Sequence, residues 1–327
     1  MTALITGASG FVGGAVAERL RAGGERVIGL SRRPAPHADH VQMDLGAPDA
    51  IRRLTELRPA PEVIVHAAAR AEPWGSAAQF HAGTVTTTAA IVRWAAALRP
   101  RPRLVHVSTA SVLYSGRDRL DVRPDEETGL RFVGPYARTK AAAERMVRSY
   151  PGDWVILRPR AVFGPGDTAL LPRLLDAADR ARLPRFRRGP LSDLVFIDDL
   201  VDAVVEAGSA PWMVRRTLGV AGPESVDLQE VVGRVLAATG RAPAARVVPR
   251  GLAIAAAGAV ERMWSATRPG REPPITRYAL VAYACSFTFE RPAASTAEPA
   301  LLTGRTPLDE AIGRTLATLA ADTLRNP

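Results

Sequence analysis

The sequence TALITGASGFVGGAVAERL, at residues 2–20, decides the fold of this chain. A short apolar run typical of a buried strand leads into Gly7, Gly10 and Gly13, and a helix-like segment follows. Gly7 allows a tight turn, Gly10 leaves its backbone open to a pyrophosphate, and Gly13 lets the helix pack closely on the strand. Because the first N–H groups of a helix lack partners within it, its N-terminus attracts an anion. The stretch therefore predicts a strand–turn–helix unit that binds a dinucleotide.

Six further β-rich runs alternate with segments of helix length. They are RVIGL (26–30), HVQMD (40–44), EVIVHAA (62–68), RLVHVST (103–109), DWVILRP (153–159) and TLGVAG (217–222). Runs with little polar alternation are typical of strands buried on both faces, so we expect an α/β fold with a doubly wound parallel sheet, a Rossmann fold. Residues 165–193 and 223–327 are richer in Pro and Arg. We expect them to form a second, smaller substrate-binding lobe, interleaved with a dinucleotide-binding domain of residues 1–164 and 194–222.

Composition excludes several classes of protein. The chain has 327 residues, 47% hydrophobic and 23% charged, which suits a large core and argues against disorder. Its single cysteine, Cys285, excludes an internal disulfide framework and a cysteine-rich zinc site, and we expect no metal. With no signal peptide before the first strand, we expect a cytoplasmic protein. The net charge of +10 is spread along the chain without a nucleic-acid motif, so we expect no nucleic-acid partner.

Two stretches leave alternatives open. GLAIAAAGAV (251–260) is too short to span a membrane, which takes ~20 residues. We expect a buried helix there and no transmembrane segment, with an interfacial segment that touches a membrane as the alternative. Arg185, Arg187 and Arg188 form the densest basic cluster, which we interpret as a solvated loop rather than a site for a phosphate-bearing substrate.

The end of the second β-rich run bears on the choice of cofactor. It reads Ser31, Arg32 and Arg33, with no Asp or Glu. An acidic residue at this place typically holds the free 2′-hydroxyl of NAD, whereas arginine accommodates the 2′-phosphate of NADP. Two adjacent guanidinium groups can bind a phosphate, so the sequence favours NADP(H), with NAD(H) as the alternative. Asp44, followed by Leu45, is placed to bind the adenine amino group, or else to cap the strand end.

Lys140 is the only lysine among 43 Lys+Arg, and it follows Tyr136 by one helical turn. Side chains at i and i+4 lie on one helix face and can contact a common ligand. A phenol with a pKa near 10 exchanges protons poorly at neutral pH, and a nearby ammonium lowers that pKa. Lysine also reaches ribose hydroxyls, for which arginine is no substitute. We therefore expect an acid/base pair, completed by a hydroxyl of Ser108, Thr109 or Ser111 that holds the substrate carbonyl oxygen.

Seven motifs, in order, make the chain resemble an extended short-chain dehydrogenase/reductase. They are TGASGFVG, VIVHAAA, VSTASVLY, YARTK, LRPRAVFGPGD, LVFIDDLVDAV and LGVAGPES. The stretches RAVFGPGDTALLPRLL, PPITRYAL and LLTGRTPLDEAIGRTL are similar to the 3β-hydroxysteroid dehydrogenase-like branch of that superfamily. The resemblance implies an oxidoreductase with a nicotinamide cofactor and a small-molecule substrate, and homodimers are common in the family it resembles.

The resemblance also assigns roles to single positions. Tyr136 matches the general acid/base and Lys140 its partner. Thr109 matches the hydroxyl of the catalytic triad, with Ser111 as the alternative. The positions that match the cofactor site, besides Tyr136 and Lys140, are Gly7, Ser9, Gly10, Phe11, Val12 and Gly13 at the pyrophosphate, Ala67, Ala68 and Ala69 beside the adenosine ribose and diphosphate, and Pro159, Ala161 and Val162 against the nicotinamide.

The chain departs from the family pattern in two places. Residues 80–84 read FHAGT where many members carry Asn in an N-V-x-G-T turn, which puts a proton relay through that Asn in doubt. His81 and His66 are candidates to replace it, although we interpret His66 as a packed strand end. The segment after Thr109 lacks the Asp-Glu pair of nucleotide-sugar 4,6-dehydratases, which argues against that reaction.

We therefore expect an NADP(H)-dependent oxidoreductase that interconverts a ketone and a secondary alcohol on a bulky, hydrophobic substrate. The alternative is a nucleotide-sugar epimerase with a retained NAD, whose diphosphate the arginines at 185–188 could bind. A non-catalytic NADP-binding protein is a third class, disfavoured by the intact Thr-Tyr-Lys set. We expect the substrate pocket at the 73–83 loop, the segment after Ser111 and the second lobe. Trp74 and Phe186 are candidates there, though each is equally expected to be core.

Overall fold

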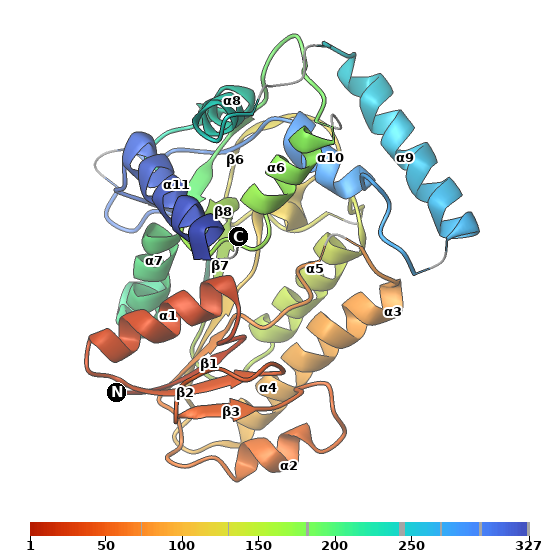
Figure 1. Ribbon diagram of the computed structural model, residues 1–327. Helices are drawn as coiled ribbons and strands as arrows, with labels where there is room; N and C mark the ends of the chain where they lie inside the picture. Colours follow the sequence, from red (N-terminus) through yellow and green to blue (C-terminus); the bar gives the residue numbers. More distant parts are fainter. Residues whose placement is uncertain are drawn as a thin grey trace.

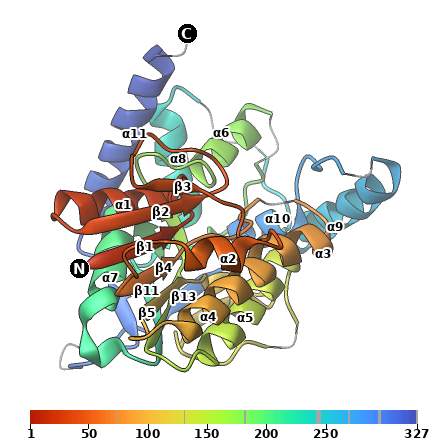
Figure 2. The ribbon, with the colours of Figure 1, turned by 90° about the horizontal axis from the view of Figure 1, so that it is seen from below.

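The computed structural model describes residues 1–72, 74–129, 131–180, 183–241, 246–268, 270–293 and 296–325, with side chains through residue 319. Its main body is an eight-stranded sheet between two layers of helices (Figures 1 and 2). In sheet order the strands are β14 (Leu301–Thr303), β11 (Arg216–Ala221), β7 (Trp154–Pro159), β5 (Arg103–Val107), β4 (Val63–His66), β1 (Thr2–Thr6), β2 (Arg26–Ser31) and β3 (His40–Gln42). Every neighbouring pair is parallel. The predicted doubly wound parallel sheet is confirmed.

Helices cover both faces of this sheet, because each central strand is buried on both sides. One face carries α1 (Phe11–Ala22) and α7 (Ile197–Ser209). The other carries α2 (Ala50–Thr55), α4 (Thr87–Ala97) and α5 (Pro135–Arg148) (Figure 2). Proline stands at the first position of α5, where its missing N–H has no helical partner to lose. This start places Tyr136 in the first turn, at the carboxyl edge of the sheet.

A second region lies beyond that edge (Figure 1). Its strands are β6 (Arg119–Val122), β13 (Phe287–Phe289), β9 (Leu191–Ser192) and β12 (Val226–Asp227) in one sheet, and the parallel pair β8 (Ala161–Phe163) and β10 (Leu194–Phe196). Its longer helices are α6 (Leu171–Asp179), α8 (Leu228–Ala238), α9 (Arg250–Thr267), α10 (Arg277–Ala284) and α11 (Leu308–Arg325). The short elements of the chain are α3 (Ala77–Phe80), the π-helix η1 (His81–Thr86), and the 3₁₀ turns η2 (Ala110–Leu113) and η3 (Pro211–Met213).

The two regions exchange strands at places that the expected boundaries did not include. β14 comes from the 223–327 segment, yet it pairs with β11 in the main sheet. β6 comes from the 1–164 segment, yet it pairs with β13 in the smaller sheet. The interleaved division into two domains stays a prediction. It has to be fitted to these two exchanges and to β8 and β10, which pair with each other outside the main sheet although both come from segments assigned to the dinucleotide-binding domain.

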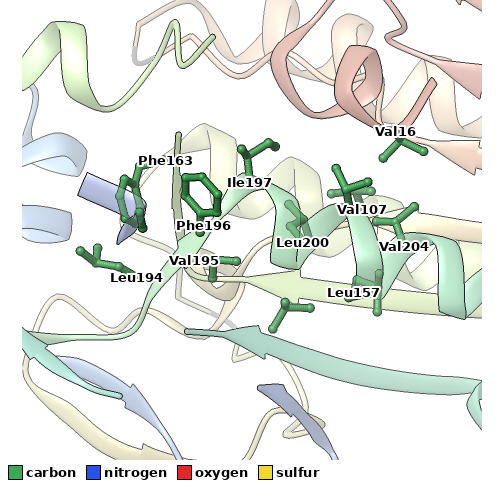
Figure 3. Close-up of a cluster of buried hydrophobic side chains, with 14 of the residues drawn as sticks. Val16, Val107, Leu157, Phe163, Leu194, Val195, Phe196, Ile197, Leu200 and Val204 are labelled. Atoms are coloured by element: carbon green, nitrogen blue, oxygen red, sulfur yellow. The ribbon is translucent and has the colours of Figure 1, made fainter. Parts of the chain in front are cut away.

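A continuous hydrophobic cluster joins the main sheet to the second region (Figure 3). Val16 of α1 and Val204 of α7 pack over Val107 and Leu157 of the central strands, and the cluster continues through Leu200. Further along, it reaches the aromatic side chains of β8 and β10, where the rings of Phe163 and Phe196 meet edge to face at 5.9 Å. Because one core underlies both regions, the second region is anchored to the main sheet by packing.

The α9 helix corrects one expectation. The 251–260 stretch is helical as predicted, but it is not buried, because only Ala257 and Gly258 of α9 are covered. Leu252 is 65% exposed, and α9 lies at the margin of the molecule, packed against α10 (Figure 1). The alanine and glycine residues of α9 let α10 pack against one narrow strip of that helix, so the rest of the apolar surface of α9 is not buried. Among the described residues, no helix is both long and apolar enough to cross a membrane.

A buried ion pair fastens α5 to β7. Glu144 accepts hydrogen bonds from Arg158 Nε at 2.9 Å and Nη2 at 2.7 Å, and both side chains are fully buried. Ser108 donates to the same carboxylate at 2.6 Å. Arg158 also donates to the carbonyl oxygens of Pro124 and Glu126. Burial alone would raise the pKa of Glu144, but the hydrogen bonds and charge of Arg158 hold it below its ordinary value.

Replacing Glu144 with Gln should lower the free energy of unfolding by about 3–5 kcal/mol, because it leaves the Arg158 charge buried and unpaired. Urea unfolding followed by tryptophan fluorescence measures the loss. Asp125→Asn is the matched control, since Asp125 and Arg123 form an exposed pair, and it should cost less than about 1 kcal/mol. Equal effects of the two substitutions would contradict a central role for the buried pair.

Candidate active site

The glycine turn after β1 has the geometry that a pyrophosphate requires. Gly7 has φ +73°, and its carbonyl oxygen accepts the N–H of Gly10 at 2.8 Å. A Cβ atom on Gly13 would clash with the Gly7 carbonyl oxygen, so helix and turn touch through bare backbone. The first turn of α1 has no capping side chain and no acidic residue, so its N–H groups are open to an anion. These residues fit the diphosphate of a dinucleotide.

The 67–69 segment lies directly against this turn. The N–H of Ala68 donates to Thr6 Oγ1 at 3.1 Å, and a Cβ atom on Gly7 would lie 3.0 Å from the Ala68 nitrogen. Ala67, Ala68 and Ala69 are half-buried. The strand ends after β1 and β4 therefore form one continuous wall of small residues.

The predicted adenosine end is open and basic. Arg32 and Arg33 are exposed at the end of β2, and Arg33 Nη2 donates to the Ser9 carbonyl oxygen at 3.1 Å. Ser31 is bonded to His40 Nε2 at 3.0 Å. Arg33 therefore bridges the strand end and the glycine turn, which is where the adenosine ribose would lie.

Asp44 and Leu45 differ in what they can offer a cofactor. Asp44 is exposed and accepts the N–H of Gly46 at 2.8 Å, as a loop-capping aspartate does, although its carboxylate remains accessible. The Leu45 side chain is buried in the core, so only its backbone could contact a ligand.

Four hydroxyl side chains gather at the end of β5: those of Thr109, Ser111, Tyr136 and Tyr278. Thr109 caps η2, accepts the N–H of Ser111 at 3.2 Å and donates to Ser111 Oγ at 3.1 Å. Ser111 Oγ is in turn 2.8 Å from the hydroxyl of Tyr278 on α10. The Tyr136 ring lies edge-on to the Tyr278 ring, with centroids 5.7 Å apart. The structure thus brings Thr109 and Tyr136 together and adds Tyr278, which the sequence reading missed.

Burial, rather than a neighbouring cation, dominates the electrostatics of Tyr136. Burial raises its pKa to about 12, and the hydrogen bond with Thr109 opposes this only in part. The expectation that Lys140 lowers the pKa of Tyr136 is therefore wrong for this arrangement. The Lys140 side chain is 1% exposed and donates instead to the Val107 carbonyl oxygen at 2.6 Å. Burial lowers the pKa of Lys140 to about 8, although the carboxylate of Glu144 raises it.

A stacked pair of histidines, His106 and His66, lies next to Lys140. His106 Nε2 is 3.4 Å from Lys140 Nζ, and the rings of His106 and His66 are 5.3 Å apart. His66 bonds to the hydroxyls of Thr6 and Thr88. Burial, and next the Lys140 charge, lower the pKa of His66 to about 3 and that of His106 well below its ordinary value. Both are therefore neutral near pH 7, and His66 is packed at a strand end as interpreted.

The remaining candidates differ in how far they are exposed to solvent. His81 is exposed on η1, and Arg187 and Arg188 are exposed on the loop before β9. Phe186 is buried with its ring 5.9 Å from that of Tyr283, which is the environment of a core residue. Trp74 is half-buried in a loop.

The predicted nicotinamide segment continues directly from β7. Pro159 ends β7, and Ala161 and Val162 open β8, where both are half-buried. β8 pairs in parallel with β10, which leads into α7. Within the described residues, no group of three or more His, Cys, Asp or Glu side chains could hold a metal ion.

The chain is similar to a family model, to two reductases and to a solved structure. A model of the NAD dependent epimerase/dehydratase family matches residues 3–213. The 2-alkyl-3-oxoalkanoate reductase of Shewanella oneidensis is 29% identical over 89% of this chain and 80% of its own, and the protein of the same name from Stenotrophomonas maltophilia is 30% identical over 85% and 88%. A short-chain dehydrogenase/reductase superfamily protein from Agrobacterium tumefaciens, solved with bound NAD, has the same fold, with a TM-score of 0.73 at 18% identity over 99% of each chain.

Replacing Lys140 with Met should change how stability depends on pH. The folded chain releases the Lys140 proton near pH 8, whereas the unfolded chain holds it to about pH 10.5. Because the unfolded state binds more protons between these values, the stability of the wild type relative to the variant should rise across this window, by roughly 3 kcal/mol. Urea unfolding at pH values on both sides of the window measures this.

Arg145→Met is the control for that measurement, because Arg145 is exposed on the same helix and keeps its charge throughout. Its stability difference from the wild type should stay constant with pH. A constant difference for Lys140→Met as well would mean that the ammonium is not perturbed by burial.

Proposed function

The chain belongs to the NAD dependent epimerase/dehydratase family, and within it we propose an NADP(H)-dependent oxidoreductase that interconverts a ketone and a secondary alcohol on a bulky, hydrophobic substrate. The observation that carries the proposal is the cluster of Thr109, Ser111 and Tyr136 beside the buried Lys140, at the end of β5. The glycine turn lies at the same edge of the sheet, at the end of β1, with β4 between the two strands. The two 2-alkyl-3-oxoalkanoate reductases support a ketone of this kind as substrate.

In the proposed reaction each group has a separate task. A bound nicotinamide would supply or accept the hydride. Thr109 and Ser111 hold the substrate oxygen by hydrogen bonds, and Tyr136 exchanges a proton with that oxygen. Lys140 follows Tyr136 by one turn of α5 and contributes positive charge near the hydroxyls of Thr109, Ser111 and Tyr136. With a pKa of about 12 the Tyr136 phenol is protonated at neutral pH, which is the state that ketone reduction requires of a proton donor, but burial makes it a weaker acid than an ordinary phenol.

The preference for NADP(H) is proposed from the basic end of β2. Arg32 and Arg33 are exposed there, and no acidic side chain stands at the strand end to hold a free 2′-hydroxyl. The runner-up function is a nucleotide-sugar epimerase with retained NAD, favoured by the exposed Arg187 and Arg188. Such an enzyme would purify with its cofactor and would need none added. Cytoplasmic location, a homodimer and the 3β-hydroxysteroid dehydrogenase-like branch stay predictions.

Tyr136→Phe should lower kcat for ketone reduction by about 10²–10⁴-fold, because the substrate oxygen loses its proton donor. Cofactor affinity should be retained. Oxidation of NADPH and NADH across a panel of ketones and nucleotide sugars measures turnover, and fluorescence titration measures cofactor binding. The control is Tyr150→Phe, since the hydroxyl of the buried Tyr150 donates to the Pro102 carbonyl oxygen and takes no part in the proposed site. Full activity in Tyr136→Phe would rule out the proposed acid.

Removing both guanidinium groups in Arg32→Ala/Arg33→Ala should weaken NADPH binding by about 100-fold or more, since two charge-assisted bonds to a phosphate are lost and each is worth about 1.5–3 kcal/mol. NADH binding should change little. Titration of the two cofactors gives the ratio. Arg26→Ala, an exposed arginine at the opposite end of β2, should alter neither affinity. Equal binding of the two cofactors by the wild type would exclude the preference.

A further inference from the structure

Arg160 stands between β7 and β8, at the junction that carries the predicted nicotinamide segment. It is 9% exposed, which makes it one of two buried arginines within three residues of the chain. Arg158 is neutralised by Glu144. Arg160, in contrast, forms no ion pair with any carboxylate that the structure describes. A buried charge without a counter-ion is costly, so this site calls for an anion from outside the chain.

The surroundings of Arg160 satisfy only part of its guanidinium group. Its Nη2 donates to the Ala282 carbonyl oxygen at 2.9 Å, and its plane lies 4.9 Å from the centre of the Tyr114 ring and 5.8 Å from that of Phe287. The buried Nε has no hydrogen-bond partner. The buried hydroxyl of Tyr114 also has no partner that meets hydrogen-bond geometry. The Arg160 Nε is therefore left over, and the Tyr114 hydroxyl has only an imperfect contact with Ser111, which opposes the rise of its pKa. Both donors are of kinds that bind a carboxylate.

These donors adjoin the catalytic hydroxyls. Tyr114 follows Ser111 by one 3₁₀ turn, and its N–H donates to the Ser111 carbonyl oxygen at 3.1 Å. On α10, Tyr278, which bonds to Ser111, precedes Ala282, which bonds to Arg160, by one helical turn. The positive charge of Arg160 acts on both phenols, because it opposes the rise in pKa that burial causes at Tyr114 and Tyr278. Arg160 thus faces the same group of side chains that would hold a substrate ketone.

We propose that Arg160 and Tyr114 form a subsite for the carboxylate of a 3-oxo acid whose ketone oxygen is held at Thr109, Ser111 and Tyr136. This proposal rests on the ketone chemistry proposed above and names the substrate class. A 3-oxo acid is the substrate class in which the carboxylate lies close to the ketone, separated from it by a single carbon, and Tyr114 follows Ser111 by one short turn of the chain. The carboxylate is bound and not changed in the reaction: hydride reaches the ketone carbon and a proton reaches its oxygen.

A purely structural role accounts for less of what is seen. Stacking on Tyr114 and Phe287 and the bond to Ala282 would brace α10 against β7, and a neutral side chain could do much of this without burying a charge. Arg216 provides a comparison within the chain. It also stacks on an aromatic ring, that of Trp212 at 5.1 Å, and donates to backbone carbonyl oxygens, but Glu298 lies 3.5 Å away to balance its charge.

The test compares a 2-alkyl-3-oxo acid with the neutral ketone of the same chain that lacks the carboxylate. Arg160→Gln should lower kcat/KM for the acid by about 100-fold, since a charge-assisted bond to the carboxylate is lost, and should change kcat/KM for the neutral ketone by less than about threefold. Arg160→Lys keeps the charge and should recover part of the loss for the acid alone. Arg216→Gln is the matched control and should leave the ratio of acid to ketone unchanged.

A binding measurement separates this proposal from the proposed reaction. Calorimetric titration of the protein with oxidised cofactor compares a 2-alkyl-3-hydroxy acid with the matching secondary alcohol. Tighter binding of the acid, lost in Arg160→Gln, would uphold the subsite even if the wild type reduced no ketone, in which case the proposed reaction alone would fail. Equal affinity of the wild type for acid and alcohol, or a parallel loss of both in Arg160→Gln, would overturn the subsite. If Arg160→Gln does not fold, the ratio of the affinities for acid and alcohol in Arg160→Lys decides whether the subsite exists.

Discussion

The site depends on how firmly Glu144 and Arg158 hold α5 against the sheet. Tyr136, Lys140 and Glu144 are spaced four residues apart, so they line one face of α5 at successive turns. Glu144 is the last of the three along α5, and its carboxylate accepts two hydrogen bonds from Arg158 and one from Ser108. Because this anchor sets the rotation of the helix about its axis, it also aims the phenol and the ammonium. The Glu144–Arg158 pair therefore influences the position of Tyr136, the proposed proton donor, from two helical turns away.

Burial then sets the properties of the two groups that α5 presents. The same removal from water raises the pKa of the Tyr136 phenol and lowers that of the Lys140 ammonium, so each group is driven toward its neutral form. The phenol remains a proton donor at neutral pH. The Lys140 ammonium donates a hydrogen bond to the Val107 carbonyl oxygen and lies next to His106. Because His106 is neutral, it accommodates the ammonium better than a charged imidazolium would.

Much of this arrangement could be predicted from the sequence, and the limits have physical causes. Strands buried on both faces leave uninterrupted apolar runs, which is why seven of the eight strands of the main sheet were found. β14 was missed because its three residues lie far along the chain, in a segment that the sequence assigns to the second lobe, and it joins the main sheet only through tertiary packing. The apolar stretch in α9 predicted a helix correctly, but an alanine-rich helix does not reveal which of its faces a neighbour will cover. Tyr278 and Arg160 were missed because their positions depend on how distant segments pack, whereas Tyr136 and Lys140 carry their relation in local spacing.

The late position of β14 in the chain has a consequence for synthesis. β11 pairs with β7 on one side and needs Leu301–Thr303 on the other, with Gly219 and Gly304 completing the backbone bonds at either end of the pairing. While a ribosome is still translating the α8–α10 region, β11 remains an open edge with unpaired backbone groups, the kind of surface on which nascent chains associate. A transcript that stops before codon 301 would leave that edge open permanently. Truncated products should therefore be substrates for chaperones and proteases, rather than shortened but functional proteins.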